Sequence, residues 1–385
     1  MDPRERVICA LNHHEADRVP LDIGSTDVTG ITLGAYRGLL KHIGKLDRNI
    51  KFVDIVQQVV EIDEEILYEW QVDTRGVLSD PPSYWKLELK DEGSYTSFID
   101  EWGIKWVMPK EHGKYYDMVS HPLSGDVRLS EIEKYSWPKP DDQQRFKNAR
   151  EKLKNLRDNS SYALIHGGAL GGGTFELSLW LRDFENFYCD LIQNPKRACA
   201  ILDKVVELKI AYWEKALSEF GEYVDVVYEW DDLGAQETSL ISPQIYRKYI
   251  KPRHTKLFSA IKNFAPKKVY IFLHCCGSIY DLLPDLIEAG VDIINPVQIG
   301  AKKMNPTVLK REFGKDIVFW GGGVDTQKTL PYGSRNEIEE EVKRRIEEFA
   351  PGGGFVFSAI HNIQSDVPPE NILIMIEAFH KYATY

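Results

Sequence analysis

Residues 269–277 read VYIFLHCCG, an apolar run that ends on one imidazole, two thiols and a glycine. A short apolar run of this kind, rich in aromatic and β-branched residues, predicts a buried strand of a parallel sheet. Side chains alternate across a strand, so His274 and Cys276 share one face while Cys275 points to the other. The stretch therefore predicts a buried strand that presents an imidazole and a thiol at its carboxyl end.

Similar apolar runs recur on both sides of this strand, and amphipathic helical runs separate them. We expect eight strands, at Val19–Gly24, Val72–Leu78, Ala163–His166, Val224–Trp230, Val269–Cys275, Val291–Pro296, Ile317–Trp320 and Phe355–Ile360. Helices are expected at Pro243–Asn263 and Asn336–Phe349. The alternation predicts an α/β fold with a parallel sheet. Eight strands favour a (β/α)₈ TIM barrel that spans residues 1–385 as one domain, although an open doubly wound sheet gives similar local signals.

Polar side chains or glycines follow nearly every predicted strand. In a barrel these strand ends meet around one mouth, which is where such enzymes bind substrate and place their chemistry. We therefore expect the substrate-binding side chains to be His166, Tyr228, Asn295, Gln298 and Asp325.

The pair His274 and Cys276 is half of a catalytic zinc site, because such a site uses three protein ligands and leaves one position open. The third ligand must come from another strand end, where His361 and Glu229 are the best placed. The spacing also allows a structural alternative, in which the strand ends on buried polar groups and the cysteine is inert.

Carboxylates follow the predicted strand at residues 224–230. Asp231 and Asp232, together with Glu229, are candidate general acids or bases. Two other interpretations remain open: the pair lies in a solvated loop, or it caps the next helix near Ser242-Pro243.

The strand and helix pattern lapses between about Pro81 and Pro140. This stretch is rich in aromatic side chains: Tyr84, Trp85, Trp102, Trp106, Tyr115, Tyr116, Tyr135 and Trp137. We interpret it as a segment inserted into the barrel. It is either a lid over the mouth or a surface meander with a small core of its own.

Composition narrows the partners and the compartment. A net charge of -11 and a pI near 5.5 argue against nucleic acid or an anionic membrane surface as a partner. Five cysteines, an odd and low number, fit free thiols in a reducing compartment. No run approaches the length of a membrane span. We expect a cytoplasmic, soluble protein that acts on a small molecule, and a homodimer is one compatible oligomeric state.

Several longer motifs are specific enough to compare with a known family. They are Asp231-Asp-Leu-Gly, Ser242-Pro-x-x-Tyr246 with Lys251-Pro, Leu273-His-Cys-Cys-Gly277, Gly290-Val-Asp-Ile-Ile-Asn-Pro-Val-Gln298, Phe313-Gly, Gly321-Gly-Gly-Val-Asp325, Pro368-Pro-Glu-Asn371 and Leu181-Arg-Asp-Phe-Glu-Asn186. With these motifs the chain resembles the uroporphyrinogen decarboxylase superfamily over most of its length. The resemblance implies a (β/α)₈ barrel, as the strand count does.

Two chemistries are implied by this resemblance: decarboxylation of porphyrinogen acetates, and methyl transfer to or from a corrinoid on a partner protein. Decarboxylases of the superfamily carry an Arg-Gln-Ala-Gly-Arg segment that holds substrate carboxylates. This chain has Val19-Pro-Leu-Asp-Ile-Gly-Ser-Thr26 there, so those carboxylates lack bidentate partners. The resemblance therefore favours the methyltransferase branch. A decarboxylase acting on a tetrapyrrole or a smaller carboxylic acid is the alternative, and a non-catalytic binding barrel is a third.

The methyltransferase branch has His-x-Cys-Gly where this chain has His274-Cys-Cys276-Gly, and a later cysteine completes its zinc site. His361 stands at that later position here. The resemblance implies Zn²⁺ at His274, Cys276 and His361, and a small O-, N- or S-methyl substrate. In an O-demethylation, zinc or an acid such as Glu229 would polarise the leaving oxygen. The chain has no Asp-x-His-x-x-Gly corrinoid signature, so a corrinoid-binding partner protein would supply that cofactor.

Overall fold

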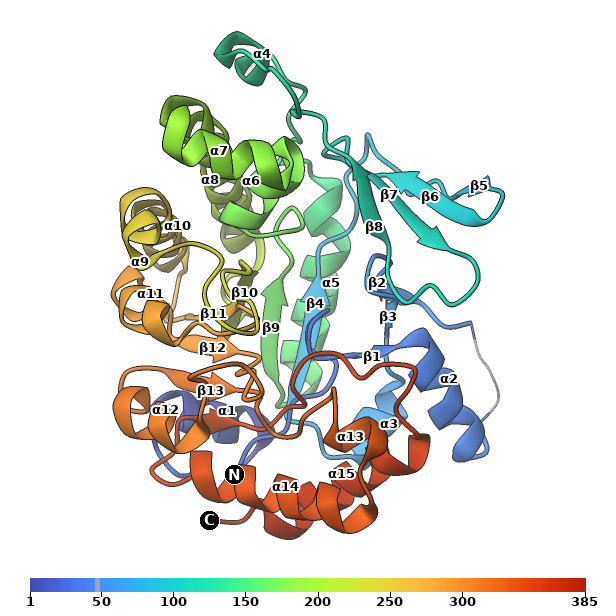
Figure 1. Ribbon diagram of the computed structural model, residues 1–385. Helices are drawn as coiled ribbons and strands as arrows, with labels where there is room; N and C mark the ends of the chain where they lie inside the picture. Colours follow the sequence, from blue (N-terminus) through green and yellow to red (C-terminus); the bar gives the residue numbers. More distant parts are fainter. Residues whose placement is uncertain (46–48) are drawn as a thin grey trace.

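A parallel sheet of seven strands forms the centre of the molecule in the computed structural model, which describes residues 1–45 and 49–385 (Figure 1). In spatial order the strands are β14 (Phe355–Val356), β13 (Val318–Trp320), β12 (Ile293–Asn295), β11 (Tyr270–His274), β10 (Val226–Trp230), β9 (Ala163–Gly167) and β4 (Thr74–Leu78). All neighbours in this order are parallel. The predicted α/β fold of the TIM-barrel type is confirmed.

The predicted first strand, Val19–Gly24, takes the eighth position without forming a regular strand. Leu21 makes an isolated parallel bridge to Phe357, just after β14, and its carbonyl accepts a hydrogen bond from Asp73 N, just before β4, at 2.9 Å. The ladder stays short because Pro20 has no N–H to donate and Leu21 N bonds instead to the Asp73 carboxylate at 2.8 Å. Backbone hydrogen bonds therefore link the two edges of the sheet through this segment.

The strand register brings the carboxyl ends of neighbouring strands to one level. Trp230 pairs with His274, and His274 pairs with Asn295, so these three side chains point to the same side of the sheet. That side is the barrel interior, which is filled by Ala163, Ile165, Val226, Tyr228, Tyr270, Phe272, Ile293, Val318, Trp320 and Val356. Helix α1 (Pro3–Leu11) adds apolar side chains to this interior cluster at the amino-terminal end of the strands.

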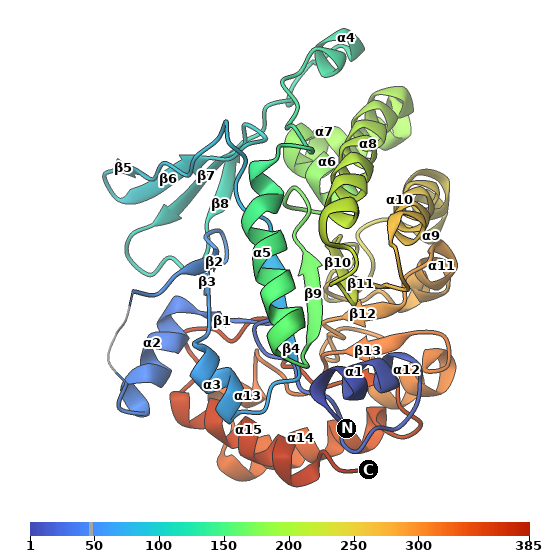
Figure 2. The same ribbon diagram turned by 180° about the vertical axis from the view of Figure 1, so that it is seen from behind.

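Helices cover the outer side of the sheet, as the two opposite views show (Figures 1 and 2). They are α2 (Leu33–His42), α3 (Glu64–Glu69), α5 (Gln144–Asn159), α6 (Thr174–Arg182), α7 (Phe184–Gln193), α8 (Pro195–Phe220), α11 (Leu283–Ala289), α12 (Pro306–Phe313), α13 (Thr329–Tyr332), α14 (Arg335–Phe349) and α15 (Pro369–Tyr382). The expected helix Asn336–Phe349 is α14. Among the described helices, none is long and apolar enough to cross a membrane.

The expected helix Pro243–Asn263 is divided into three parts. They are α9 (Pro243–Ile245), a π-helical turn η1 (Tyr246–Ile250) and α10 (Lys251–Phe264). Pro252 lies at the start of α10 and cannot donate the hydrogen bond that a continuous α-helix needs there, which accounts for the interruption.

The aromatic segment predicted between about 81 and 140 forms a separate antiparallel sheet with a short helix. Its strands are β5 (Lys90–Glu92), β6 (Tyr95–Ile99), β7 (Lys105–Pro109) and β8 (Asp117–Ser120), and α4 is Leu129–Glu133. Trp102 Nε1 donates to Leu170 O at 2.7 Å, and Trp106 lies edge-on to Trp180 of α6 at 5.4 Å. The segment therefore packs on the connection that follows β9, at the carboxyl end of the sheet.

A second small antiparallel sheet flanks the same end. It has the order β1 (Ile31–Thr32), β3 (Val59–Val60), β2 (Phe52–Asp54). Ile31 also bridges Ile363, which ties this sheet to the connection after β14.

Candidate functional site

Three predicted metal ligands come together at the carboxyl end of the sheet. His274 is the last residue of β11, Cys276 follows it by two residues, and His361 lies in the connection after β14. One ligand atom from each lies within 4.8 Å of the other two. His274 Nε2 is 3.3 Å from Cys276 Sγ, and the two imidazole rings are 5.2 Å apart, centre to centre. We call these three residues the triad.

Asn295 sets the orientation of the first ligand. Its Nδ2 donates to Trp320 O at 2.8 Å, so its Oδ1 faces His274 and accepts a hydrogen bond from Nδ1 at 2.5 Å. Burial lowers the pKa of His274 to about 4, which keeps the imidazole neutral. With its proton on Nδ1, the ring presents the lone pair of Nε2 to Cys276, as a zinc ligand requires. Asn295 itself is fully buried behind the ring.

The hydrogen bonding of His361 is less favourable for metal binding than that of His274. Its backbone has φ of 69°, in the left-handed region, and its Nδ1 accepts a hydrogen bond from Asn362 N at 2.8 Å. That bond places the ring proton on Nε2. Binding of a cation through Nε2 must displace this proton, and binding through Nδ1 must break the bond to Asn362. Burial, followed by His274, lowers the pKa of His361 to about 3, so the ring is neutral.

Asp232 is the predicted acid that the structure brings to the triad. Its Oδ1 accepts a hydrogen bond from Cys276 N at 2.7 Å and lies 4.0 Å from His274 Nε2. Burial raises the pKa of the Cys276 thiol well above its usual range, and the charge of Asp232 adds to this effect. The thiol is therefore protonated in the metal-free protein. A divalent cation at the triad would favour the thiolate, because cysteine binds metal only after losing its proton.

Asp231, the residue before Asp232, has a structural role. Its buried carboxylate accepts hydrogen bonds from Phe175 N and Glu176 N, both at 2.8 Å, and from His254 Nε2 at 2.8 Å. The sequence left open that a carboxylate here caps a helix near Ser242. Asp231 does cap a helix, but the helix is α6, while Ser242 caps α9 through its own hydroxyl.

Glu229 and His166 lie away from the triad, in the layer between the sheet and α8. Glu229 forms a buried ion pair with Lys209 Nζ at 2.7 Å and accepts a hydrogen bond from Trp213 Nε1 at 2.5 Å. His166 bonds to Val77 O at 2.7 Å and to the Tyr212 hydroxyl at 2.9 Å. Side chains alternate along a strand, and Tyr228 of β10 and Ile165 of β9 face the barrel interior. Glu229 and His166, the next residues on these strands, therefore face the outer side. The expectation that Glu229 supplies a ligand or acid at the mouth, and that His166 binds substrate, is therefore corrected.

The remaining predicted substrate residues are distributed around the mouth. Gln298 Oε1 accepts a hydrogen bond from Gly277 N at 2.8 Å, directly beside Cys276. Asp325 is half-buried and accepts hydrogen bonds from Gln327 N and Lys328 N at 2.7 and 3.1 Å, which shapes its own turn. Tyr228 is fully buried in the barrel interior, and its hydroxyl makes no hydrogen bond of good geometry.

Two further residues at the mouth were missed by sequence reasoning. Glu176 lies in the first turn of α6, and burial, followed by the charges of Asp232 and Asp231, raises its pKa well above the usual range. Tyr115 lies in the connection between β7 and β8, and burial, followed by Asp366 and then by its neighbour Cys276, raises the pKa of its phenol. The position of Glu176 in the first turn of the helix that follows β9 was a usable signal. No local signal links Tyr115 to the triad.

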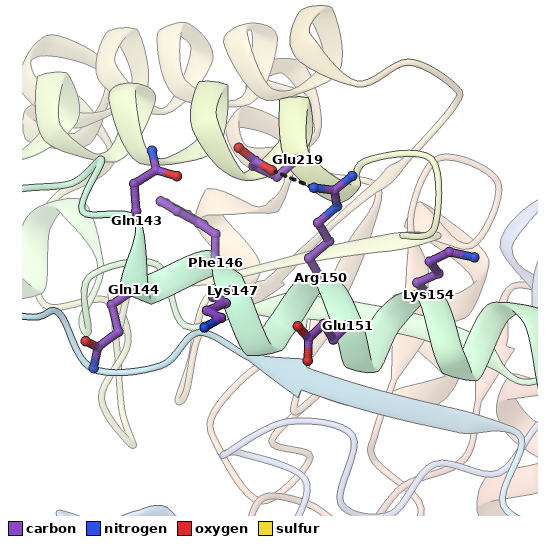
Figure 3. Close-up of a pocket in the computed structure, with 8 residues that line it drawn as sticks. All are labelled: Gln143, Gln144, Phe146, Lys147, Arg150, Glu151, Lys154 and Glu219. Atoms are coloured by element: carbon purple, nitrogen blue, oxygen red, sulfur yellow. Dashed lines mark hydrogen bonds and ion pairs between the residues drawn. The ribbon is translucent and has the colours of Figure 1, made fainter.

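A groove on the outer flank of the barrel lies between α5 and the end of α8 (Figure 3). Its lining includes Phe146, Lys147, Lys154 and an Arg150–Glu219 ion pair of 3.5 Å. None of the predicted site residues lines it, and its charged side chains are typical of a solvated helix face.

Comparison with known proteins gives a family and a fold. Residues 112–382 match the family model described as uroporphyrinogen decarboxylase (URO-D). A uroporphyrinogen decarboxylase from Geobacter sulfurreducens is 25% identical over 270 residues, which cover 68% of this chain and 72% of that protein. One from Syntrophotalea carbinolica is 25% identical over 221 residues, which cover 55% of this chain and 58% of that protein.

Among solved structures, a methyltransferase from Methanosarcina mazei superposes on nearly the whole chain. The TM-score is 0.67 with 18% sequence identity, and the match covers 99% of each chain. At this identity the likeness establishes the fold alone.

Proposed function

The chain belongs to the uroporphyrinogen decarboxylase family, and we propose that it acts within that family as a methyltransferase. It would move a methyl group between a small O-, N- or S-methyl compound and a corrinoid that a partner protein presents at the barrel mouth. Removal of a methyl group from an ether, an O-demethylation, is one form of this reaction. We place the reaction in the cytoplasm and expect the aromatic segment to cover the substrate.

The observation that carries the proposal is the geometry of the triad. A neutral imidazole nitrogen, a thiol and a second imidazole lie within 4.8 Å of one another, and Asn295 holds the first imidazole in the metal-binding tautomer. This donor set fits zinc, which takes nitrogen and sulfur ligands in tetrahedral sites. When bound, zinc would supply a Lewis acid that lowers the pKa of a thiol or polarises an ether oxygen.

The protein's own groups would handle the protons. Asp232 contacts Cys276 and is partly open to solvent, with a side chain that is 35% exposed, so it is placed to accept the proton that Cys276 or a substrate thiol loses. Gln298 and Asp232 fix the backbone on either side of the thiol by accepting hydrogen bonds from Gly277 N and Cys276 N. The triad is thereby held in place before substrate arrives.

The first loop of the barrel supports methyl transfer over porphyrinogen decarboxylation. Residues 19–26 contain no arginine. The nearest one, Arg18, is bonded to the Asp73 carboxylate at 2.8 and 3.1 Å, beside the start of β4 and so at the opposite end of the barrel from the triad. A substrate with many carboxylates would therefore meet no guanidinium from this loop.

The direct test uses methylcob(III)alamin and a simple thiol as probes, with the zinc-loaded protein. We expect loss of the methylcobalamin spectrum with formation of the methyl thioether, and we expect Cys276→Ala to abolish it. The second candidate, decarboxylation, is favoured by the names of the sequence relatives, so a parallel incubation with uroporphyrinogen is needed. Accumulation of less carboxylated porphyrinogens without methyl transfer would overturn the proposal.

A further inference from the structure

A buried carboxylate and a half-buried one lie near a buried phenol at the barrel mouth. Asp27 is in the first loop, Asp54 ends β2, and Tyr228 points inward from β10. The hydroxyl of Tyr228 and the Oδ1 atom of Asp27 make no hydrogen bond of good geometry, and the weak contact between these two side chains leaves most of their hydrogen-bonding capacity open. Asp27 is 7% exposed and Tyr228 is not exposed. Buried polar atoms normally find partners, so these two oxygens indicate that a ligand group is missing here.

The titratable side chains that act on one another at this point are all acidic. Burial, followed by the charge of Asp54, raises the pKa of Asp27 to about 7. The charges that act on the Tyr228 phenol are those of Asp27, Asp54 and Glu176. Within residues 1–45 and 49–385, the salt bridges include none with Asp27 or Asp54, and Asp54 is held by neutral donors, Val56 N at 2.7 Å and Gln57 Nε2 at 2.9 Å. A cation from outside would meet two carboxylates that no Lys or Arg side chain pairs within the part of the chain that the structure describes.

This acidic group borders the triad. Asn362, the residue after His361, donates from Nδ2 to Asp27 O at 2.8 Å and to Gln57 Oε1 at 3.1 Å. On the other side, Glu176 interacts with both Tyr228 and Asp232. One molecule can therefore reach the triad with one end and the acidic group with the other.

We infer that Asp27, Asp54 and Tyr228 form a subsite for an ammonium group on the substrate. The inference rests on the proposed function, because the triad defines which end of the substrate reacts. The substrate class is then a small amine whose other end carries the sulfur or oxygen that gains or loses the methyl group. An ammonium has three N–H donors, which can reach the oxygens of Asp27, Asp54 and Tyr228, and its charge offsets the two carboxylates. A carboxylate or sulfonate at the same end would be repelled.

Binding of three matched thiols to the zinc-loaded, full-length protein tests this subsite. The probes are 2-aminoethanethiol (cationic), 2-mercaptoethanol (neutral) and 3-mercaptopropionate (anionic), with affinities measured by calorimetry. We expect the amine to bind about tenfold more tightly than the neutral thiol, and the anion to bind most weakly. In Asp27→Asn and Asp54→Asn the amine preference should fall to about twofold or less. Tyr228→Phe should reduce the preference for the amine, but by less than either aspartate variant does. Asp141→Asn, which removes one charge at an exposed loop position, should leave it unchanged.

A probe without sulfur separates this inference from the proposed function. We expect butylammonium to bind the Cys276→Ala variant as it binds the wild-type protein, and to lose binding in Asp27→Asn. If all three thiols fail to bind but butylammonium binding depends on Asp27, the zinc role is wrong and the ammonium subsite stands. If the thiols bind without preference, and butylammonium does not bind, the subsite is refuted while the triad stands. Circular dichroism of each variant identifies one that fails to fold, and Asp54→Asn then replaces Asp27→Asn.

Discussion

Asn295 accepts a hydrogen bond from Nδ1 of His274 at 2.5 Å while donating to the Trp320 carbonyl at 2.8 Å. The second bond fixes which end of the amide faces the imidazole, and the first fixes where the imidazole proton resides. The tautomer of a proposed metal ligand is thus set by a residue that would not touch the metal. Such partners contribute measurably to metal affinity.

Replacement of Asn295 by leucine should keep the packing volume and remove the anchor of the imidazole. We expect zinc affinity to fall by about 10- to 100-fold, because His274 would lose both its orientation and its tautomer preference. Competition with a chromogenic chelator measures the change. Asn155→Leu on the exposed face of α5 is the control. Unchanged zinc affinity in Asn295→Leu would show that His274 is not a ligand.

His361→Cys should tighten zinc binding by about tenfold or more. A thiolate is a better zinc ligand than an imidazole whose free nitrogen is already engaged with Asn362 N, and it adds negative charge to the site. The same chelator competition applies, with His14→Cys at an exposed position as the control for adding a thiol. Weaker binding in His361→Cys than in the wild-type protein would mean that His361 coordinates in a way that a shorter side chain cannot replace.

Glu229→Gln should destabilise the protein and leave its metal content unchanged. The glutamine keeps the size of the side chain but leaves the fully buried ammonium of Lys209 without a counter-charge. Breaking a buried pair from one side costs about 3–5 kcal/mol. Urea unfolding and metal analysis of the same sample give both values. A stable variant that has lost its zinc would return Glu229 to the metal site.

His166 should make the metal-free protein less stable at acidic pH. Burial lowers the pKa of His166 from 6.5 to about 4, so between these values the unfolded chain binds a proton that the folded chain does not. Stability from this group is therefore complete above pH 6.5 and is lost as the pH falls toward 4, by about 3 kcal/mol in total. The loss in unfolding free energy between pH 7 and pH 4 should be smaller by about this amount in His166→Gln. An equal loss in the two proteins would show that His166 is not held neutral in the folded state.

The sequence allowed the barrel to be predicted because each strand is a short apolar run with a polar end. It did not show which face of a strand points inward. On β10, residues 226–229 are all buried, so no alternation of polarity marks Glu229 as an outward residue. The register of β10 against β11, in which Trp230 pairs with His274, is what places Glu229 on the α8 side.

The triad was partly predictable for a similar reason. His274 ends β11 and Cys276 follows it by two residues, so continued alternation puts the two side chains together, and His361 was assigned from its position at a strand end. Asp27 and Asp54 had no such signal. They are far from the triad in sequence, and they meet Tyr228 only because the first loop and the β1–β3–β2 sheet fold over the barrel mouth.

The measurement that tests the central claim most directly is the zinc content of the purified wild-type protein and of Cys276→Ala, prepared without chelator. Cys189→Ala, which removes an exposed thiol from α7, is the matched control. We predict about one zinc per chain in the wild-type protein and in Cys189→Ala, and less than about a tenth of that in Cys276→Ala. Absence of zinc from the wild-type protein, or full occupancy in Cys276→Ala, would contradict the account.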